Sequence, residues 1–514
     1  MSANVTTILA AARIQREAGA WEAALRLYQT AAAGDASPEI RHNLALCHFG
    51  LGSLDAALRH SAEALSLKPD LWQSRMIQAK ILRARGQIEL THQTLKAVLR
   101  HSPANGPALL ALADIEMNEF GDPLAAAARV APLHRTPEHR AEAELTLLMS
   151  RLYDRDESDE ALSTALQSFA ARELTLPARP AAPPRPIGER PRVGLMSPLF
   201  AISPVYFLTI GALRLLSRQV ELVIVNRGLR VDQGTRAFRT IAAEWHEAAN
   251  VGAGALAERI RRLDLDVLID LGGWSDPTGM KALSARPAPR QYKWVGGQSA
   301  TTGLAAFDGF ITDAEQSPEG AERLHSEPLL RLPGGYATYE PDFAPDDIPL
   351  PDDGDAGRFG LGVIGNPAKI SRAFLARLAA RLDETATDVL FVDRRYRHAP
   401  ATRRIVDALP ARHRPRLHFI GPADRSDYLR HVRRPARIID TFPYNGGLTS
   451  LEALYLGRPI EVARSGAIFS SRHTASHFHY WRNAARRDHR GLAASLAELV
   501  GGRLASTDGR KGRR

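Results

Sequence analysis

The sequence predicts two structures in series, an all-α solenoid and then an α/β region made of two Rossmann-like lobes. Three observations predict this: a repeat of 34 residues near the N-terminus, a proline-rich stretch, and a later alternation of short apolar runs with helical patterns. A chain of 514 residues is also too long for one hydrophobic core. We expect domains at 1–172, 193–345 and 346–514, with a proline-rich linker at 173–192.

The first domain repeats at a constant step. Three sets of positions keep the 34-residue spacing: Ala57, Thr91 and Ala125; Gly52 and Gly86; Pro69 and Pro103. Small residues let two helices pack closely, and glycine and proline interrupt the chain between helices. The period therefore predicts stacked helical hairpins with tetratricopeptide spacing, whose concave groove would bind a protein. An alanine-rich bundle without a groove is the alternative.

The second region alternates between strand-like and helix-like patterns. Its short apolar runs are Val220–Val225, Val267–Leu271, Leu361–Ile364, Val389–Val392, Leu417–Ile420 and Ile438–Ile439. Such alternation is typical of parallel sheets covered by helices on both faces. The segment Pro341–Gly357, rich in proline, aspartate and glycine, divides the region into two similar halves, which predicts two lobes with a cleft between them.

Composition argues against several classes of protein. The net charge of +10 is spread over scattered arginines, and only Arg510–Arg514 forms a dense basic tail, so nucleic-acid binding is not expected. The single cysteine, Cys47, fits a buried small side chain in a reducing compartment, and Met1–Ala20 does not resemble an export signal. We therefore expect a cytoplasmic protein.

A charge-free stretch from Val193 to Leu213 is long enough to span a membrane. Pro198 and Pro204 interrupt its helical pattern, however. A buried strand, a turn and a core helix explain the stretch better than a membrane span.

The most informative motif lies at 438–455. A buried strand leads into a turn with Gly446 and Gly447, and a helix follows. The unpaired N–H groups at a helix start can bind a diphosphate, and glycines allow an anion to approach closely.

Four side chains of this motif have two interpretations. Thr449 and Ser450 can donate hydroxyl hydrogen bonds to the diphosphate, and Glu452 can accept bonds from a ribose diol. Alternatively, Asn445 and Thr449 cap the helix and Glu452 stabilises its positive end.

The stretch Asp440–Thr449 resembles a signature of glycosyltransferase family 41, which includes O-GlcNAc transferases and SPINDLY-type protein fucosyltransferases. Further segments agree in the same order: Arg286–Pro289 with Trp294 and Thr301–Gly303; Leu329–Gly334; and Asn366–Ile370. The resemblance covers roughly residues 193–480. An upstream tetratricopeptide array is the usual arrangement of this family.

The resemblance implies a metal-independent GT-B fold, in which the C-terminal lobe holds the nucleotide and the acceptor polypeptide crosses the cleft. It implies that Lys369 contacts the diphosphate and is catalytic, and that Asn366 lies at the nucleotide. A lysine and helix-terminal amides can stabilise a leaving phosphate without a metal. The predicted donor-binding residues are Asn366, Asn445, Gly446, Gly447, Thr449, Ser450 and Glu452. We expect a UDP-sugar as co-substrate and no other cofactor.

The sequence also departs from the family. Ser203 precedes Pro204 where the family commonly has histidine, and Trp274 stands where many bacterial members have another histidine. The segment Gly296–Thr301 carries one extra residue. The base that activates the acceptor is therefore not identified.

Three other histidines are close together in the sequence. His473 and His477 could share a helix face, as zinc ligands do, but no acidic partner in a known pattern accompanies them. We expect these two and His479 to lie on the surface or to face the acceptor.

The predicted function is transfer of a sugar from a nucleotide sugar to serine or threonine of a protein bound in the groove of the repeats. Flagellin or another surface protein is a candidate acceptor by analogy with bacterial relatives. The sugar could be N-acetylglucosamine, another hexose, a deoxysugar or a nonulosonic acid. A catalytically inactive scaffold that keeps the fold, and an enzyme of membrane-surface glycan synthesis, are the alternatives.

Overall fold

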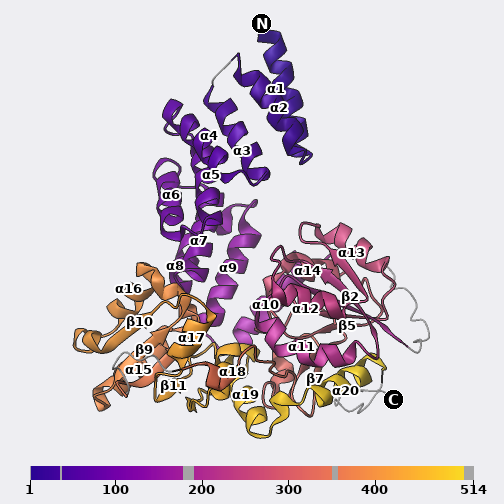
Figure 1. Cartoon of the computed structure of the whole chain (residues 1–514), viewed down its shortest axis with the longest axis vertical. Coiled ribbons are helices and arrows are strands. Elements are labelled where there is room, and N and C mark those ends of the chain that lie inside the picture. Colours follow the sequence, from indigo (N-terminus) through magenta and orange to yellow (C-terminus); the bar gives the residue numbers. More distant parts are fainter. Residues whose placement is uncertain (1, 35–36, 178–189, 350–356, 503–514) are drawn as a thin grey trace. The chain divides into compact units, whose positions relative to one another are not determined.

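The structure is a computed structural model that describes residues 2–34, 37–177, 190–349 and 357–502 (Figure 1). Most of the predicted linker and the whole basic tail lie outside these ranges, as does part of the segment predicted to separate the lobes. The chain forms two compact units, 1–147 and 148–514, each of which is described by itself.

The first unit consists of helical hairpins. Its helices are α1 (Ser2–Glu17), α2 (Trp21–Ala32), α3 (Pro38–Gly50), α4 (Leu54–Leu67), α5 (Trp72–Ala84), α6 (Ile88–His101), α7 (Gly106–Asn118) and α8 (Pro123–Val130). Consecutive helices pack as pairs, and the turns inside the pairs contain Gly19, Gly52, Gly86 and Gly121, all with positive φ. Ala57 and Thr91 are buried at equivalent places of α4 and α6. The tetratricopeptide prediction is confirmed, and Cys47 is buried as expected.

The helix α9 (Arg140–Tyr153) crosses the boundary between the units, and α10 (Asp159–Glu173) lies wholly in the second. The structure thus differs from the predicted division at residue 172. Close packing explains the difference: a Cβ atom at Gly303 would lie 2.7 Å from the Ala170 Cβ. In addition, the Ser163 hydroxyl of α10 donates to the Leu324 carbonyl at 2.5 Å. The α10 helix therefore belongs with the α/β region.

The first lobe is built on a parallel sheet. Its strands are β1 (Arg192–Ser197), β2 (Glu221–Asn226), β3 (Glu244–Glu247), β4 (Val267–Asp270), β5 (Gln291–Lys293), β6 (Gly309–Thr312) and β7 (Leu329–Arg331), in the order β3-β2-β1-β4-β5-β6-β7. The helices are α11 (Pro204–Leu216), α12 (Gln233–Ile241), α13 (Ala253–Arg261) and α14 (Pro277–Leu283).

The charge-free stretch 193–213 is β1, a turn and α11, as the sequence predicts. Within the ranges that the structure covers, no helix has both the length and the apolar character needed to cross a membrane.

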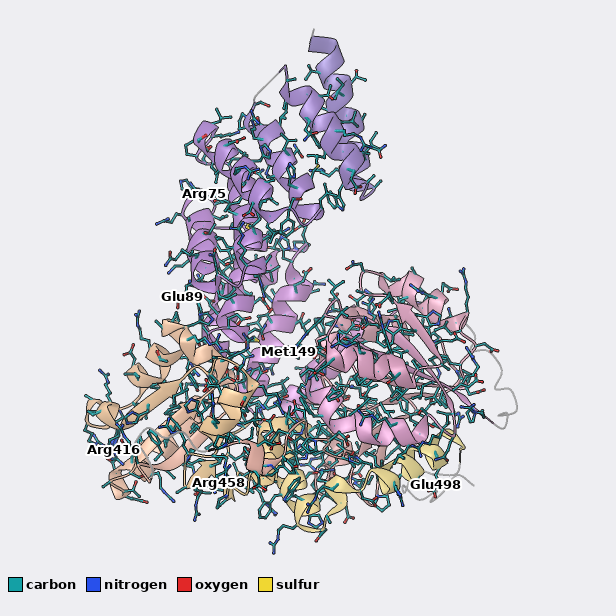
Figure 2. The ribbon with its side chains drawn as sticks, viewed as in Figure 1. Arg75, Glu89, Met149, Arg416, Arg458 and Glu498 are labelled. Atoms are coloured by element: carbon teal, nitrogen blue, oxygen red, sulfur yellow. The ribbon has the colours of Figure 1, made fainter. Side chains whose placement is uncertain are left out.

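The second lobe has its own parallel sheet. Its strands are β8 (Phe359–Ile364), β9 (Asp388–Val392), β10 (Leu417–Ile420), β11 (Arg437–Ile439) and β12 (Ile460–Glu461), in the order β10-β9-β8-β11-β12. The helices are α15 (Arg372–Glu384), α16 (Ala399–Ala408), α17 (Arg425–Val432) and α18 (Leu448–Tyr455). Apolar side chains of the strands and helices form buried cores in both lobes, and Figure 2 draws the side chains over the ribbon. All six apolar runs are strands, and the two Rossmann-like lobes are confirmed.

The C-terminal helices are α19 (His473–Arg482) and α20 (His489–Val500). The α20 helix packs against α11, and its Leu492, Leu496 and Val500 belong to the core of the first lobe. The prediction that the second lobe continues to residue 514 is therefore wrong, because α20 packs in the first lobe. The apolar stripe of α20 is buried against α11, a helix with apolar residues on most of its surface.

Candidate functional site

The predicted donor residues gather at the carboxyl ends of two neighbouring strands, β8 and β11. From β8 the chain continues to one side of the sheet through β9 and β10, and it then returns to β11 on the other side. Ligands of open α/β sheets bind at such a switch point. The turn that follows β8 comes close to the start of the helix Leu448–Tyr455, because a Cβ at Gly365 would lie 3.3 Å from the Thr449 Cγ2.

Lys369 ends the turn that follows β8. Its Nζ donates to the Asn445 carbonyl at 2.7 Å and lies 4.3 Å from the centroid of the Tyr444 ring. Burial lowers the pKa of Lys369 to about 8, although the carboxylate of Asp440 opposes this fall. The ammonium is thus held at the motif that follows β11, with its charge only partly compensated.

Asp440 shapes that motif, a role that the sequence pattern does not predict. Its Oδ1 accepts the Gly446 N–H at 2.9 Å, and its Oδ2 accepts the Ala463 N–H at 3.3 Å. Burial raises the pKa of Asp440 to about 7, against these hydrogen bonds and the charge of Lys369. The position of Asp440 directly after a buried strand is the sequence feature that could have predicted this role.

The two glycines of the turn have different surroundings. A Cβ at Gly446 would lie 2.2 Å from the Ser450 Oγ, whereas a Cβ at Gly447 would have no atom of the described residues within 4 Å. Gly446 therefore permits tight packing inside the protein. The open backbone at Gly447 permits close approach by a ligand.

The start of α18 follows Gly447, its N-cap residue, and within the described residues no side chain caps it. The alternative interpretation, in which Asn445 and Thr449 cap this helix, does not describe the structure: the Asn445 amide donates instead to the Thr441 carbonyl at 2.7 Å. The Ser450 hydroxyl is bonded to that of Thr474 at 2.8 Å. Backbone N–H groups, rather than Ser450, are thus the available donors.

Asn366 supports the turn that carries Lys369. Its side chain accepts the Ala368 N–H at 3.0 Å. Ser371, two residues after Lys369, donates its hydroxyl to the Phe442 carbonyl at 2.7 Å. The turn is therefore joined to the motif that follows β11.

Glu452 is bound inside the protein. It is 1% exposed, and its Oε1 accepts from Arg425 at 2.7 Å. Arg425 also bonds Asp342 and lies 4.4 Å from the centroid of the Phe207 ring in the first lobe. Burial raises the pKa of Glu452, and Arg425 opposes part of this rise. In this structure Glu452 stabilises Arg425, and its contact with a ribose stays a prediction.

The first lobe reaches the same site through Ser299. The Ser299 and Tyr444 hydroxyls are 2.9 Å apart, and the Ser299 carbonyl accepts the Ser470 N–H at 2.9 Å. The residues at the family's histidine positions are bonded within the protein: the Ser203 hydroxyl donates to the Leu199 carbonyl, and the Trp274 indole donates to the Thr301 carbonyl.

The histidines of α19 correct a prediction. His473 and His477 are 9% and 0% exposed, so they are buried and not on the surface. Burial lowers the pKa of His473 to about 3 and holds the pKa of His477 well below its usual value. Their rings stack with centroids 6.3 Å apart. The His479 side chain is 45% exposed, as expected for a surface residue. Within the described ranges, no group of three or more His, Cys, Asp or Glu residues could hold a metal.

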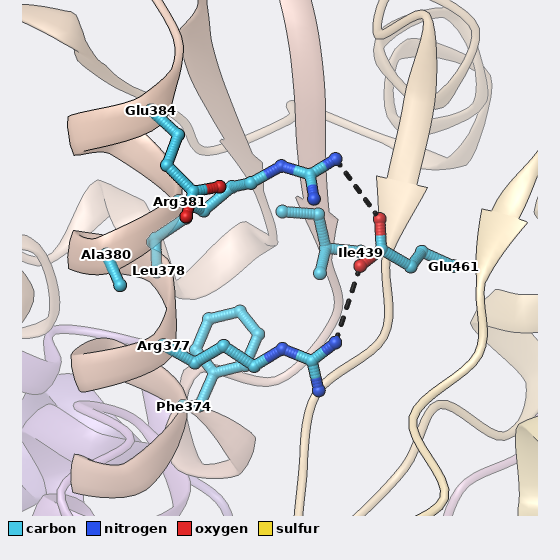
Figure 3. Close-up of a pocket in the computed structure, with 8 residues that line it drawn as sticks. All are labelled: Phe374, Arg377, Leu378, Ala380, Arg381, Glu384, Ile439 and Glu461. Carbon is cyan, nitrogen blue, oxygen red and sulfur yellow. Dashed lines mark hydrogen bonds and ion pairs between the residues drawn. The ribbon is translucent and has the colours of Figure 1, made fainter.

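A separate pocket of about 200 Å³ lies beside α15, β11 and β12. Figure 3 shows Glu461 of β12 between Arg377 and Arg381 of α15. The Glu461 Oε1 lies 3.5 Å from the Arg377 Nη2, and its Oε2 lies 3.6 Å from the Arg381 Nη2. The residues that line this pocket include none of the predicted donor-binding residues. These ion pairs join α15, the helix that follows Lys369, to β12, the strand that precedes Ala463.

Comparison with known proteins agrees with this architecture. Residues 181–339 match the model of Glycosyl transferase family 41. Two plant proteins named probable UDP-N-acetylglucosamine–peptide N-acetylglucosaminyltransferase SPINDLY are 27% identical over 344 residues (Solanum lycopersicum) and 26% identical over 350 residues (Hordeum vulgare). These matches cover 62% and 65% of this chain, but only 35% and 36% of those proteins.

A solved structure matches nearly the whole chain. It is a mutant O-GlcNAc transferase of Thermobaculum terrenum, and the match has a TM-score of 0.57 and 23% identity, covering 98% of this chain and 93% of that one. The two proteins share a fold. Together, the matched segment, the relatives and the shared fold confirm that the chain resembles glycosyltransferase family 41, with tetratricopeptide repeats before two Rossmann-like lobes.

Proposed function

We propose that the protein transfers a sugar from a nucleotide sugar to a serine or threonine hydroxyl of a protein. One observation carries the proposal: the Lys369 ammonium, the open backbone at Gly447 and the uncapped start of α18 lie together at a switch point. When the sugar–phosphate bond breaks, its electron pair stays on the phosphate. A cation and oriented N–H groups stabilise that charge.

The donor that we propose is a UDP-sugar, with UDP-N-acetylglucosamine as the first candidate. The names of the plant relatives and of the Thermobaculum protein support this choice. Because Lys369 supplies the positive charge at the leaving phosphate, we propose that transfer needs no metal. Activity that survives EDTA would support this part of the proposal.

The acceptor that we propose binds the repeats. A pocket of about 430 Å³ lies along α3, α5, α6 and α7, lined by apolar residues such as Trp72 and Met76 with Lys80 and Arg83 among them. A flagellin or another exported protein, modified in the cytoplasm, is the candidate acceptor. The buried single thiol of Cys47 fits that compartment.

The test combines candidate acceptors with a panel of nucleotide sugars and follows the mass of the acceptor. A mass increase equal to one sugar is expected with the correct pair. Lys369→Ala should lower turnover by about 10²–10³-fold, because a preorganised charge at the developing anion is lost. Asp383→Asn, on the helix that follows Lys369, removes the negative charge that pairs with Arg412 and His413, and it is the matched control.

A second candidate is a scaffold that keeps the fold without catalysis. The residues at the two family histidine positions, Ser203 and Trp274, motivate it, because their polar groups are bonded to backbone carbonyls. No mass gain with any acceptor, together with no hydrolysis of any donor, would favour the scaffold over the transferase.

A further inference from the structure

The corner between α9 and α10, residues 153–159, contacts the turn that follows β8, the motif that follows β11 and the segment that follows β12. Tyr153, Asp154 and Asp159 make these contacts. All three precede the segment 181–339 that matches the family model, and the sequence motifs assign them no role. They belong to the same compact unit as the two lobes.

Tyr153 stacks on the Tyr444 ring, over which the Lys369 ammonium lies. The centroids of the Tyr153 and Tyr444 rings are 5.0 Å apart, and the rings are inclined by 14°. The Lys369 ammonium lies over the same Tyr444 ring. Burial raises the pKa of both phenols, so both are neutral at physiological pH. Tyr153 thus shields a ring that contacts the cation.

Asp154 holds the turn that follows Lys369. Its Oδ2 accepts the backbone N–H of Arg372 at 2.9 Å, and its Oδ1 accepts the Arg372 Nε at 3.1 Å. Asp156 accepts from the same guanidinium at 2.9 Å. On the other side of the turn, Ser371 is bonded to Phe442. The turn is therefore fixed from two directions.

Asp159 holds the segment that follows β12. Its Oδ2 accepts the N–H groups of Ala467 at 2.6 Å and Ile468 at 3.1 Å. A Cβ at Gly466 would lie 2.6 Å from the same oxygen, so this approach depends on glycine. The segment begins near Ala463, whose N–H is bonded to Asp440.

We propose that this corner is a wall of the donor site, and that Tyr153 and Asp154 are positioning residues for Lys369. Tyr153 fixes the ring and excludes water beside the ammonium, while Asp154 fixes the turn that carries it. The inference rests on the proposed function, since it assigns these residues to the site where the diphosphate would bind. It also extends that site to helices outside the matched segment.

The pKa of Lys369 provides a measurement that a general loss of protein stability would not change. Asp440 and Asp393 raise the pKa of Lys369, Arg395 lowers it, and burial lowers it most. His473 of α19 also faces this charge and is neutral. If Tyr153 is replaced by a smaller side chain without a ring, water reaches the ammonium and the pKa of Lys369 rises.

The experiment measures UDP binding to the full chain by calorimetry as a function of pH. Tyr153→Leu should weaken binding by about tenfold to a hundredfold near neutral pH, as expected when a binding group is displaced. In Tyr153→Leu, the pH at which UDP affinity falls on the alkaline side should also be higher than in the wild type. Tyr153→Phe keeps the ring and should behave like the wild type, as should Asp383→Asn.

Asp154→Asn gives an independent measurement in case Tyr153→Leu lowers the melting temperature of the whole protein. It preserves side-chain volume, loses the charge beside Arg372, and should also weaken UDP binding. Unchanged affinity in Asp154→Asn, or unchanged affinity and pH dependence in a folded Tyr153→Leu, would overturn this inference alone. Failure of the wild-type protein to bind UDP, pyrophosphate or any other nucleoside diphosphate would overturn the proposed function as well.

Discussion

Lys369 is a half-buried cation whose charge changes in the neutral to alkaline range. Because burial lowers its pKa to about 8, the ammonium loses its proton as the pH rises through that value. Loss of the positive charge should weaken UDP binding between about pH 7 and about pH 9. Calorimetry across this range measures the effect.

Lys369→Arg is the control for this titration, because a guanidinium stays protonated over the whole range. The fall in affinity should disappear in Lys369→Arg even if its affinity at neutral pH is lower. The same fall in both proteins would assign the titration to another group.

Glu452 offers a second prediction for a single residue. Glu452→Gln replaces the carboxylate that neutralises Arg425, and among the described residues Arg425 then keeps Asp342 as its one charged partner. We expect a loss of about 1–3 kcal/mol in the free energy of unfolding, seen as a lower melting temperature. The preference for UDP over its 2′-deoxy analogue should be unchanged. A reduced preference would instead support the ribose contact that the motif suggests.

The contacts that the sequence could predict are those between residues close together in the chain. Asn445, Gly446 and Gly447 lie in one continuous motif, so the turn and the helix start could be predicted together. Asp154 bonds Arg372, 218 residues away, and Arg425 bonds Glu452, 27 residues away. No local pattern marks such pairs, because the fold alone brings them together.

At the scale of elements, the two glycines of the turn before α18 have different roles. Gly446 is needed for packing inside the protein, and Gly447 is needed for approach of the ligand. Gly447→Ala adds a methyl group where the described protein atoms leave open space. We expect its melting temperature to stay close to that of the wild type while UDP affinity falls, because the methyl group occupies space needed by the ligand. Thermal melting and calorimetry on the same preparation measure both effects.

Gly446→Ala is the comparison for this turn. Its methyl group would meet the Ser450 hydroxyl, so both stability and binding should decrease. Equal UDP affinity in Gly447→Ala and the wild type would show that the diphosphate does not approach this part of the backbone.

The elements themselves could be predicted from periodicity, but their partners could not. Each of the six apolar runs is a strand, because short apolar segments between helices are typical of buried parallel strands. The burial of α20 follows from its spacing of leucines, yet nothing local indicates that it packs on α11 in the other lobe. For α19, polar side chains suggested exposure, whereas His473 and His477 are buried among aromatic rings.

At the scale of the whole molecule, the border between the two compact units decides how the protein can be divided. The sequence placed the end of the repeats at residue 172, after α10. The compact units instead meet at 147/148, because α10 packs on the first lobe. A cut at residue 172 therefore removes Tyr153, Asp154 and Asp159 from the lobes that they contact.

Two truncated proteins separate recruitment of the acceptor from binding of the donor. A protein that begins at Arg140 keeps α9 and α10, and it should bind UDP with nearly the affinity of the full chain while it modifies a whole acceptor protein poorly. A protein that begins at Leu174 lacks the corner and should lose UDP affinity as well. Circular dichroism verifies folding, calorimetry measures UDP binding, and mass spectrometry measures acceptor modification. Equal UDP affinity in the two would contradict the role of the corner, and undiminished modification by the first would contradict the role of the repeats.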